Sequence, residues 1–265
     1  FSGFSAVAVR DRLEDCQPKV LITCDGSYRR GKPIATKPQA DEAIAGLEYI
    51  EKVVVVKRNG QETAMQEGRD VWWDDFVAGQ PATFDTLPMD SADPLFILYT
   101  AGAGGKPRGI VHTHAGASVG PAFTSSWVFD IKDTDVYWCT ADIGWITGHS
   151  YIAYGPLSLG ATSVMYEGSP DYPDFGRWFS IIEEYGVSVI YTAPTAIRMF
   201  MNEGPNWPQK YDLSTVRLMG SVGEAMNPDA FIWWRKYVGG GAAPIMDTWF
   251  QSETCSQVIA PLPIT

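Results

Sequence analysis

The chain has 265 residues, of which 45% are hydrophobic and 13% aromatic, and its formal net charge is −11. This length supports one large domain or two small ones with a substantial core. The acidic charge argues against a nucleic-acid surface, and the lack of any apolar run of about 18 residues argues against a membrane span. Four cysteines without metal-binding spacing predict free thiols in a reducing compartment, so we expect a cytoplasmic protein.

The first 92 residues alternate between helical and strand patterns. Amphipathic spacing and β-branched apolar runs distinguish the two kinds of element. Strand, helix and strand in this order favour a parallel sheet buried on both faces. The Gly-, Pro- and Asp-rich residues 57–92 predict an irregular connection, so residues 1–92 are expected to form a partial α/β lobe. The predicted elements are helices at 5–16 and 38–46, strands at 19–23 and 53–56, and a turn at Asp25 and Gly26.

Residues 93–265 are expected to form a second α/β lobe. The fold class predicted for the whole chain is α/β, with two packed mixed or parallel sheets and flanking helices. In such sheets the active loops lie at the carboxyl ends of the strands. The predicted strands of this lobe are 94–98, 110–111, 136–138, 162–165, 187–191, 217–219 and 244–246, and its predicted helices are 116–127, 150–158, 174–185, 194–203 and 228–237.

A glycine-rich loop, residues 99–109, lies between the first two strands of the second lobe. It has four glycines and Lys106, and glycine tolerates the positive φ values that an anion-binding nest of backbone N–H groups requires. The pattern indicates a phosphate-binding loop, although a Gly-rich hairpin turn has the same composition. It is not a Walker A loop, because Thr100 and Pro107 occupy positions that need glycine and Ser or Thr.

This loop resembles the signature loop of the adenylate-forming (acyl-CoA synthetase) superfamily. Further segments, in the same order along the chain, are similar to the acetyl-CoA synthetase branch; they include residues 141–150, 191–196, 220–224 and 247–254. The resemblance covers essentially the whole chain. It implies the large-domain fold of these enzymes, truncated at both ends. In the loop, Tyr99, Thr100, Gly102, Gly105, Pro107 and Gly109 match the signature, whereas Ala101, Ala103, Gly104 and Arg108 depart from it.

The resemblance implies a site for ATP or AMP and for Mg²⁺. Lys106 and Thr248 are implied to act in catalysis, with Thr248 reaching the α-phosphate, and Glu253 is implied to act there by holding Mg²⁺. The alternative is that Trp249 and Phe250 are core aromatics and Glu253 is a surface carboxylate. The implied nucleotide-binding residues are Thr100, Gly102, Gly104, Gly105, Gly223, Glu224, Ala225, Asp247, Thr248, Trp249, Phe250, Gln251 and Ser252.

The same resemblance implies an acyl pocket and contacts for coenzyme A. Trp145, Ile146, Thr147, Val222 and Phe250 match pocket positions, and their bulk leaves room for one or two carbons. Acetate enzymes of the family usually have Trp where Phe250 stands, so acetate or propionate is the expected carboxylate. Thr147, Asp171 and Ala193 match positions near the coenzyme A channel. Asp171 replaces a usual Asn and would weaken coenzyme A binding, unless it is a solvated loop residue.

The implied activity is that of an AMP-forming acetate–CoA ligase, which makes an acyl-adenylate and then acyl-CoA from small-molecule substrates. We expect the isolated chain to be the centre of a larger domain, to turn over no substrate, and to self-associate through uncovered apolar faces. The missing hydroxyls at Ala101, Ala103 and Gly104 predict weakened ATP binding with AMP binding retained. The alternatives are a catalytically impaired nucleotide-binding relative and a non-catalytic structural fragment.

Two further patterns suggest other chemistry. Gly116, Ser118 and Gly120 fit the nucleophile elbow of α/β-hydrolases, but His149 is the only histidine downstream. His112 and His114 have the spacing of two metal ligands on one strand face. Without paired cysteines they are expected to be packing residues.

Overall fold

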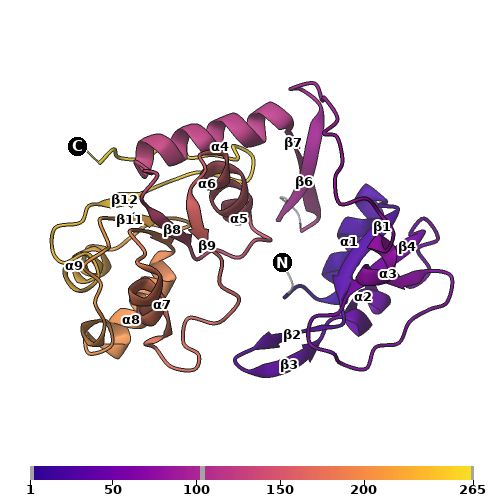
Figure 1. Cartoon of the computed structure of the whole chain (residues 1–265), viewed down its shortest axis with the longest axis horizontal. Coiled ribbons are helices and arrows are strands. Elements are labelled where there is room, and N and C mark those ends of the chain that lie inside the picture. Colours follow the sequence, from indigo (N-terminus) through magenta and orange to yellow (C-terminus); the bar gives the residue numbers. More distant parts are fainter. Residues whose placement is uncertain (1–2, 102–104, 264–265) are drawn as a thin grey trace. The chain divides into compact units, whose positions relative to one another are not determined.

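The computed structural model describes residues 3–101 and 105–263. The chain falls into two compact units. Unit 1 contains Asp90–Leu98 and Val111–Thr265, and unit 2 contains Ser2–Met89 and Tyr99–Ile110. The predicted fold class is confirmed, because parallel sheets carry flanking helices in an α/β arrangement (Figure 1).

Unit 2 is built on a three-stranded parallel sheet of order β1-β4-β5. The predicted pairing of the first two strands is confirmed, with Val20 opposite Lys52 and Cys24 opposite Val56. Its core joins Val53 and Val55 to apolar residues of the first two helices. The elements are α1 (Ala6–Cys16), β1 (Val20–Cys24), β2 (Gly26–Arg29), β3 (Lys32–Ala35), α2 (Lys37–Ile44), β4 (Lys52–Val56), β5 (Asp70–Trp72) and α3 (Trp73–Val77).

Two local predictions for unit 2 are wrong. Gly26 begins β2 of a β2–β3 hairpin instead of a turn, because the buried carboxylate of Asp25 accepts hydrogen bonds from the backbone of Gly26, Arg58 and Gly60. The connection 57–92 is also not wholly irregular, since it contains β5 and α3. Strand β5 is only three residues long, and its burial depends on pairing with β4, which a local pattern does not reveal.

Unit 1 contains a five-stranded parallel sheet of order β12-β11-β10-β8-β9. Alternate residues of each strand point to opposite faces. Trp138, Ile190 and Met219 therefore pack with α7, α8 and α9, whereas Tyr137 and Tyr191 belong to a second cluster. The elements are β8 (Val136–Cys139), β9 (Thr162–Val164), α7 (Arg177–Tyr185), β10 (Val189–Thr192), α8 (Pro194–Glu203), η2 (Pro208–Lys210), β11 (Leu218–Ser221), α9 (Pro228–Tyr237) and β12 (Ile245–Asp247).

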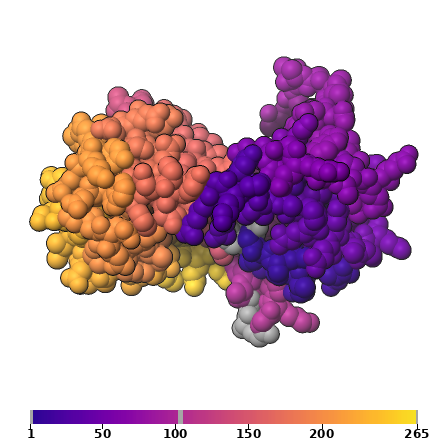
Figure 2. All heavy atoms as spheres, turned by 90° about the horizontal axis from the view of Figure 1, so that it is seen from below, coloured from indigo at the N-terminus to yellow at the C-terminus, as the bar shows by residue number. Residues whose placement is uncertain are grey.

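Helices α7, α8 and α9 pack on one face of this sheet. Figure 2 shows the region of α8 and α9, in orange, as one closely packed surface. On the other face lies α4 (His114–Val128), and Val128 and Tyr151 belong to the core cluster on that face. The predicted helix 150–158 is a compound element: α5 (Ile146–Gly148), a π-helical segment η1 (His149–Tyr154) and α6 (Gly155–Ser158). Such π-helical turns often occur at functional sites.

Strands β6 (Pro94–Ala101) and β7 (Pro107–Thr113) pair with each other in a two-stranded sheet. They flank the glycine-rich loop, and each strand contributes residues to both units.

Candidate functional site

The order of the five strands marks one edge of the sheet in unit 1 as the candidate site. From β8 the chain runs to β9 on one side and then crosses to β10 on the other. In parallel α/β sheets such a reversal opens a crevice at the carboxyl ends of the strands, where ligands bind. Thr140 directly follows β8 and Thr192 is the last residue of β10, and the hydroxyl of Thr140 donates to that of Thr192 at 2.8 Å.

Most of the sequence-predicted site residues in unit 1 lie at this edge. Each set comes after the carboxyl end of a different parallel strand, so the sheet brings together segments that are far apart in sequence. Residues 145–147 follow β8, Ala193 follows β10, residues 222–225 follow β11, and residues 248–253 follow β12, whose last residue is Asp247.

Thr248 is held by a buried chain of hydrogen bonds. Its Oγ1 donates to the carbonyl oxygen of Ser221 at 2.7 Å. The hydroxyl of Tyr191 lies 2.6 Å from Thr248 Oγ1, and Nε2 of Gln257 donates to Tyr191 at 3.2 Å. Since a threonine hydroxyl has one proton, Tyr191 is the donor to Thr248. Thr248 is only 6% exposed, so its hydroxyl faces inward in this state.

Close packing fixes the ring of Tyr191. A Cβ at Gly220 would lie 2.4 Å from Cδ2 of Tyr191 and 2.8 Å from Cε1 of Phe129. Glycine is therefore needed at this position of β11, and the two rings pack with centroids 4.6 Å apart. Burial raises the pKa of Tyr191 well above its usual value, so the phenol remains protonated and can donate.

The loop after β11 is open to solvent. Residues 223–225 are exposed, and Gly223 has a φ of +96°, which favours glycine. Glu224 turns toward α8, where its Oε2 accepts from Nη2 of Arg198 at 2.7 Å and its Oε1 accepts from the hydroxyl of Thr195. The hydrogen bonds from Thr195 and the ion pair with Arg198 lower the pKa of Glu224.

Three of the predicted acyl-pocket residues share a packed environment. Phe250 packs against the cluster that contains Val222 and also against the cluster that contains Ile146. Its ring meets that of Tyr151 edge-on, with centroids 5.3 Å apart. Trp145 is 48% exposed, and its carbonyl accepts from Nδ1 of His149 at 3.0 Å. Phe250 thus contacts both the cluster of Val222 and the cluster of Ile146.

The segment after β12 forms a tight turn that presents Ser252 and Glu253. The carbonyl of Gln251 accepts from the backbone N–H of Thr254 at 3.1 Å and of Cys255 at 3.2 Å. Trp249 is 49% exposed, and its backbone N–H donates to Ile259 at 2.8 Å, which fixes its position without burying its ring. The ring is therefore accessible to a planar ligand.

Glu253 is the candidate metal ligand. Within residues 3–101 and 105–263, no group of three or more His, Cys, Asp or Glu side chains could hold a metal ion. Glu253 is exposed, however, and Mg²⁺ is usually held by one or two carboxylates together with substrate phosphates. A single accessible carboxylate fits that pattern. Burial lowers the pKa of the nearby His112, which is therefore neutral near pH 7.

The predicted coenzyme A residues come from three segments. Thr147 is in α5, which comes after β8, and Ala193, the N-cap of α8, directly follows β10. Asp171 lies between β9 and α7 and accepts a hydrogen bond from the hydroxyl of Ser169.

The predicted phosphate-loop residues belong to unit 2. Thr100, Gly105 and Lys106 are described, and Gly105 has a φ of +85°, as an anion-binding nest requires. Gly102 and Gly104 lie outside the described residues. At the start of the loop, the hydroxyl of Tyr99 donates to the carboxylate of Asp15 at 2.5 Å, a contact the sequence did not reveal.

The alternative hydrolase and metal patterns lack the geometry that they need. Ser118 lies inside α4 and its hydroxyl donates to the carbonyl of His114 at 2.7 Å, whereas a nucleophile elbow places serine at a strand-to-helix turn. His112 is buried, and its ring packs at a tilt against that of Phe96, with ring centroids 4.9 Å apart. It is a packing histidine, as expected.

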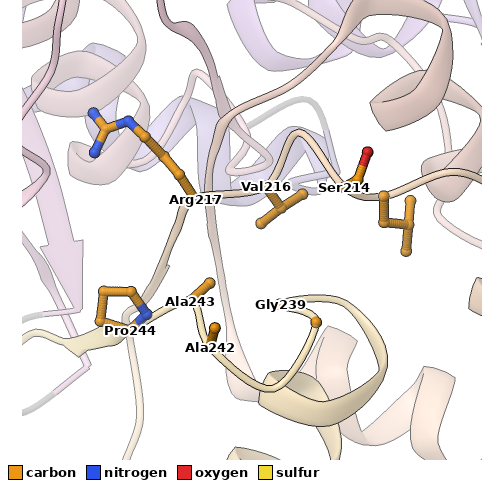
Figure 3. A pocket seen from close by; sticks show the side chains of 9 residues that line it. Ser214, Val216, Arg217, Gly239, Ala242, Ala243 and Pro244 are labelled. Carbon is orange, nitrogen blue, oxygen red and sulfur yellow. The ribbon is translucent and has the colours of Figure 1, made fainter.

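A pocket of about 340 Å³ lies at the opposite edge of the same sheet (Figure 3). Arg217 precedes β11 and Pro244 precedes β12, so the pocket is at the amino ends of these strands. Nε of Arg217 donates to Asp135 at 2.8 Å. None of the sequence-predicted site residues lines this pocket.

Sequence reasoning missed the side chains that support the predicted site. Tyr191 and Gln257 hold Thr248, and Thr195 and Arg198 hold Glu224. Tyr191 gave a usable signal, since a tyrosine near the end of a fully buried strand needs a partner for its hydroxyl. The other three become relevant only when separate strands are brought together.

Comparison with known proteins gives consistent matches. The profile of the family described as AMP-binding enzyme matches residues 1–265. The acetyl-coenzyme A synthetase of Methanothrix thermoacetophila is 61% identical over 265 residues, which are all of this chain and 40% of that protein. The enzyme of the same name from Methanothrix soehngenii is 57% identical over all of this chain and 39% of its own length, and that of Streptomyces avermitilis is 56% identical over 99% and 40%.

A solved structure, that of acetoacetyl-CoA synthetase from Streptomyces lividans, has the same fold. The TM-score is 0.85 at 25% sequence identity, and the match covers 98% of this chain and 40% of that one. The chain therefore spans about 40% of the length of the proteins it resembles. In the part of the chain that the structure describes, no helix is long and apolar enough to cross a membrane. All four cysteines are free thiols, as predicted.

Proposed function

The chain belongs to the AMP-binding enzyme family, and from that premise we propose that it binds an adenine nucleotide at the carboxyl edge of the five-stranded sheet in unit 1. One observation carries the proposal: the residues that match the family's nucleotide contacts follow neighbouring strands β11 and β12 at that edge. The edge also adjoins the reversal of strand order, where ligands bind in such sheets.

The exposed groups at this edge suit the parts of a nucleotide. Trp249 offers an accessible aromatic face for adenine, residues 223–225 form the opposing loop, and Asp247 is an exposed acceptor for the adenine amine. Ser252, at the turn, offers a hydroxyl to the phosphates. Thr248 is proposed to reach the α-phosphate, which requires its hydroxyl to turn away from Ser221.

In unit 2, Thr100, Gly105 and Lys106 are proposed to contact the outer phosphates, with Gly102 and Gly104 in the same loop. Glu253 would hold Mg²⁺ as one carboxylate ligand. Bound there, Mg²⁺ would neutralise charge on the phosphates. The protein's contribution is chiefly to position the reacting groups and stabilise charge.

Because this chain spans about 40% of its relatives, the full reaction is proposed for proteins of their length. That reaction is AMP-forming activation of a short carboxylate, acetate or propionate, followed by transfer to coenzyme A. Ile146, Val222 and Phe250, together with Trp145 and Thr147, are proposed to enclose the acyl group. Thr147, Asp171 and Ala193 are proposed to lie near coenzyme A, with the charge of Asp171 weakening its binding.

Calorimetric titration of the chain with AMP, MgATP and a non-hydrolysable acyl-adenylate tests the proposal. We expect AMP and the acyl-adenylate to bind, and Trp249→Ala to weaken both. Trp127→Ala is the matched control, because Trp127 is 57% exposed on α4, away from the proposed contacts. Tight adenylate with very weak ATP would favour a catalytically impaired relative. No binding of any of the three would overturn the proposal and favour a structural fragment.

A further inference from the structure

Three side chains from two neighbouring strand ends meet beside the loop 223–225. Thr195 and Arg198 lie one helical turn apart on α8, which follows β10, and Glu224 follows β11. Arg198 Nη2 lies 2.7 Å from Glu224 Oε2 and 3.2 Å from Thr195 Oγ1. The hydroxyl of Thr195 donates to the other carboxylate oxygen of Glu224. Both oxygens of Glu224 are thus engaged by one helix.

The sequence of α8 explains why a carboxylate from another segment fits here. The N-cap residue is Ala193, which has no side-chain oxygen to accept from the first turn, and Pro194 has no backbone N–H. The hydroxyl of Thr195, in the first turn of α8, donates to the carboxylate of Glu224. Glu224 therefore places a negative charge beside the first turn of α8, where such a charge is favoured.

Glu224 belongs to the exposed loop 223–225, which we propose to lie against adenine. Gly223 adopts a positive φ, and residues 223–225 are exposed, so little packing restrains them. The side chain of Glu224 ties this loop to α8, and Arg198 contributes the charged part of that connection. Exposed ion pairs of this kind add little to folding stability. The same ion pair can still fix the conformation of an exposed loop, because it joins Glu224 of the loop to Arg198 of α8.

We propose that Arg198 is a positioning residue for nucleotide binding: it holds Glu224, and with it the loop 223–225, in the conformation that receives adenine. The inference rests on the proposed function. A loop ordered before the ligand arrives avoids the entropy cost of ordering it during binding, and this raises affinity. Arg198 acts through Glu224, so it needs no contact with the nucleotide itself.

The binding test compares Arg198→Gln and Arg198→Lys with Arg235→Gln. Arg235 is an exposed arginine on α9 and serves as a charge-matched control. We expect Arg198→Gln to weaken AMP binding about threefold to tenfold, with an unchanged midpoint of thermal unfolding. Arg198→Lys should recover part of the loss, because it keeps the charge but not the planar fork. Arg235→Gln should bind AMP like the original chain.

Hydrogen exchange of the nucleotide-free chain tests the positioning role directly. Arg198→Gln should speed amide exchange within residues 223–226 and leave the core of β10 and β11 unaffected. If the original chain binds AMP and Arg198→Gln binds it equally well with unchanged exchange, the positioning role is overturned while the proposed function stands. If the original chain binds no nucleotide, the proposed function fails and this inference fails with it.

Discussion

Tyr191 and Thr248, which are 57 residues apart in sequence, place their hydroxyl oxygens 2.6 Å apart at the edge of the sheet. Gln257 donates to Tyr191, Tyr191 to Thr248, and Thr248 to the carbonyl of Ser221. The hydrogen bonds of this network all run in one direction, from Gln257 toward Ser221. The network therefore links β10, β11 and β12 to the segment beyond them. Thr248, one of the predicted nucleotide residues, is thereby attached to the fully buried strands β10 and β11.

Removing the Tyr191 hydroxyl should loosen this edge. Tyr191→Phe leaves Nε2 of Gln257 without its acceptor and Thr248 without its donor, so the free energy of unfolding should fall by about 1–3 kcal/mol. Urea denaturation measures it. Tyr185→Phe is the control, since Tyr185 is 54% exposed on α7. Equal, small effects of the two substitutions would contradict a stabilising network.

The sequence predicted the longer helices of both units and their parallel strands other than β5, because the signals of these elements are local. The fully apolar run at residues 53–56 is an example. Residues that match family segments also lie where parallel strands end. The partners of those residues were not predictable in the same way. Arg198 and Glu224 meet only because β10 and β11 are adjacent, and a single sequence does not give that order.

The errors have the same physical origin. Strand β5 was missed within residues 57–92 because three residues have no usable periodicity, and its place depends on pairing with β4. The turn predicted at Asp25 and Gly26 was wrong because the local sequence does not show that the Asp25 carboxylate is buried. That carboxylate gathers backbone N–H groups from residues 58–60 and so allows a strand to start at once.

Unit 2 should lose stability at acid pH through Asp70. The hydrogen bonds of Asp70 with Arg69, the backbone of Gln66 and Lys37 outweigh its burial and lower its pKa from 3.8 to about 2. A carboxyl with a lowered folded-state pKa stabilises the fold above its unfolded pKa, and this contribution is lost as pH falls from about 4 through 2. Unfolding midpoints measured between pH 2 and 7 should show this loss, and Asp70→Asn should flatten it.

The buried cation in the same network gives a second measurement. Lys37 Nζ lies 2.7 Å from both Asp41 and Asp70, and its side chain is 1% exposed. Lys37→Met should destabilise the protein by about 3 kcal/mol, because it leaves buried carboxylate charge less well compensated. Lys19→Met is the control, since Lys19 meets Glu51 only at 3.9 Å and is 79% exposed. A similar loss of stability from Lys37→Met and Lys19→Met would contradict the expectation that a buried ion pair matters more than an exposed one.

Restoring hydroxyls to the glycine-rich loop should raise ATP affinity selectively. The combined substitution Ala101→Ser, Ala103→Ser and Gly104→Thr adds three hydroxyl donors. Each hydrogen bond to a charged phosphate oxygen contributes about 1.5–3 kcal/mol to the binding free energy, but the three contributions do not simply add. We expect at least about tenfold tighter MgATP binding and unchanged AMP binding, measured by calorimetry. Ala82→Ser, in the connection before β6, is the control. Equal gains for AMP and ATP would show that the hydroxyls do not act on the outer phosphates.

Enlarging the ring at position 250 should sharpen selection between two-carbon and three-carbon acyl groups. Phe250 packs between the clusters of Val222 and Ile146 and meets Tyr151 edge-on, so a larger ring has to extend into the space proposed for the acyl chain. One methylene in an apolar pocket contributes about 1–3 kcal/mol. Phe250→Trp should therefore raise the preference for an acetyl- over a propionyl-adenylate analogue by about tenfold.

The ratio of the two dissociation constants, measured for each variant, is the decisive quantity because it cancels any general loss of nucleotide affinity. Phe123→Trp adds the same ring atoms on α4, where Phe123 is 54% exposed, and should leave the ratio unchanged. If Phe250→Trp weakens both analogues equally, the ring does not border the acyl group. Phe250 would then be a core aromatic whose packing supports the adjacent nucleotide segment.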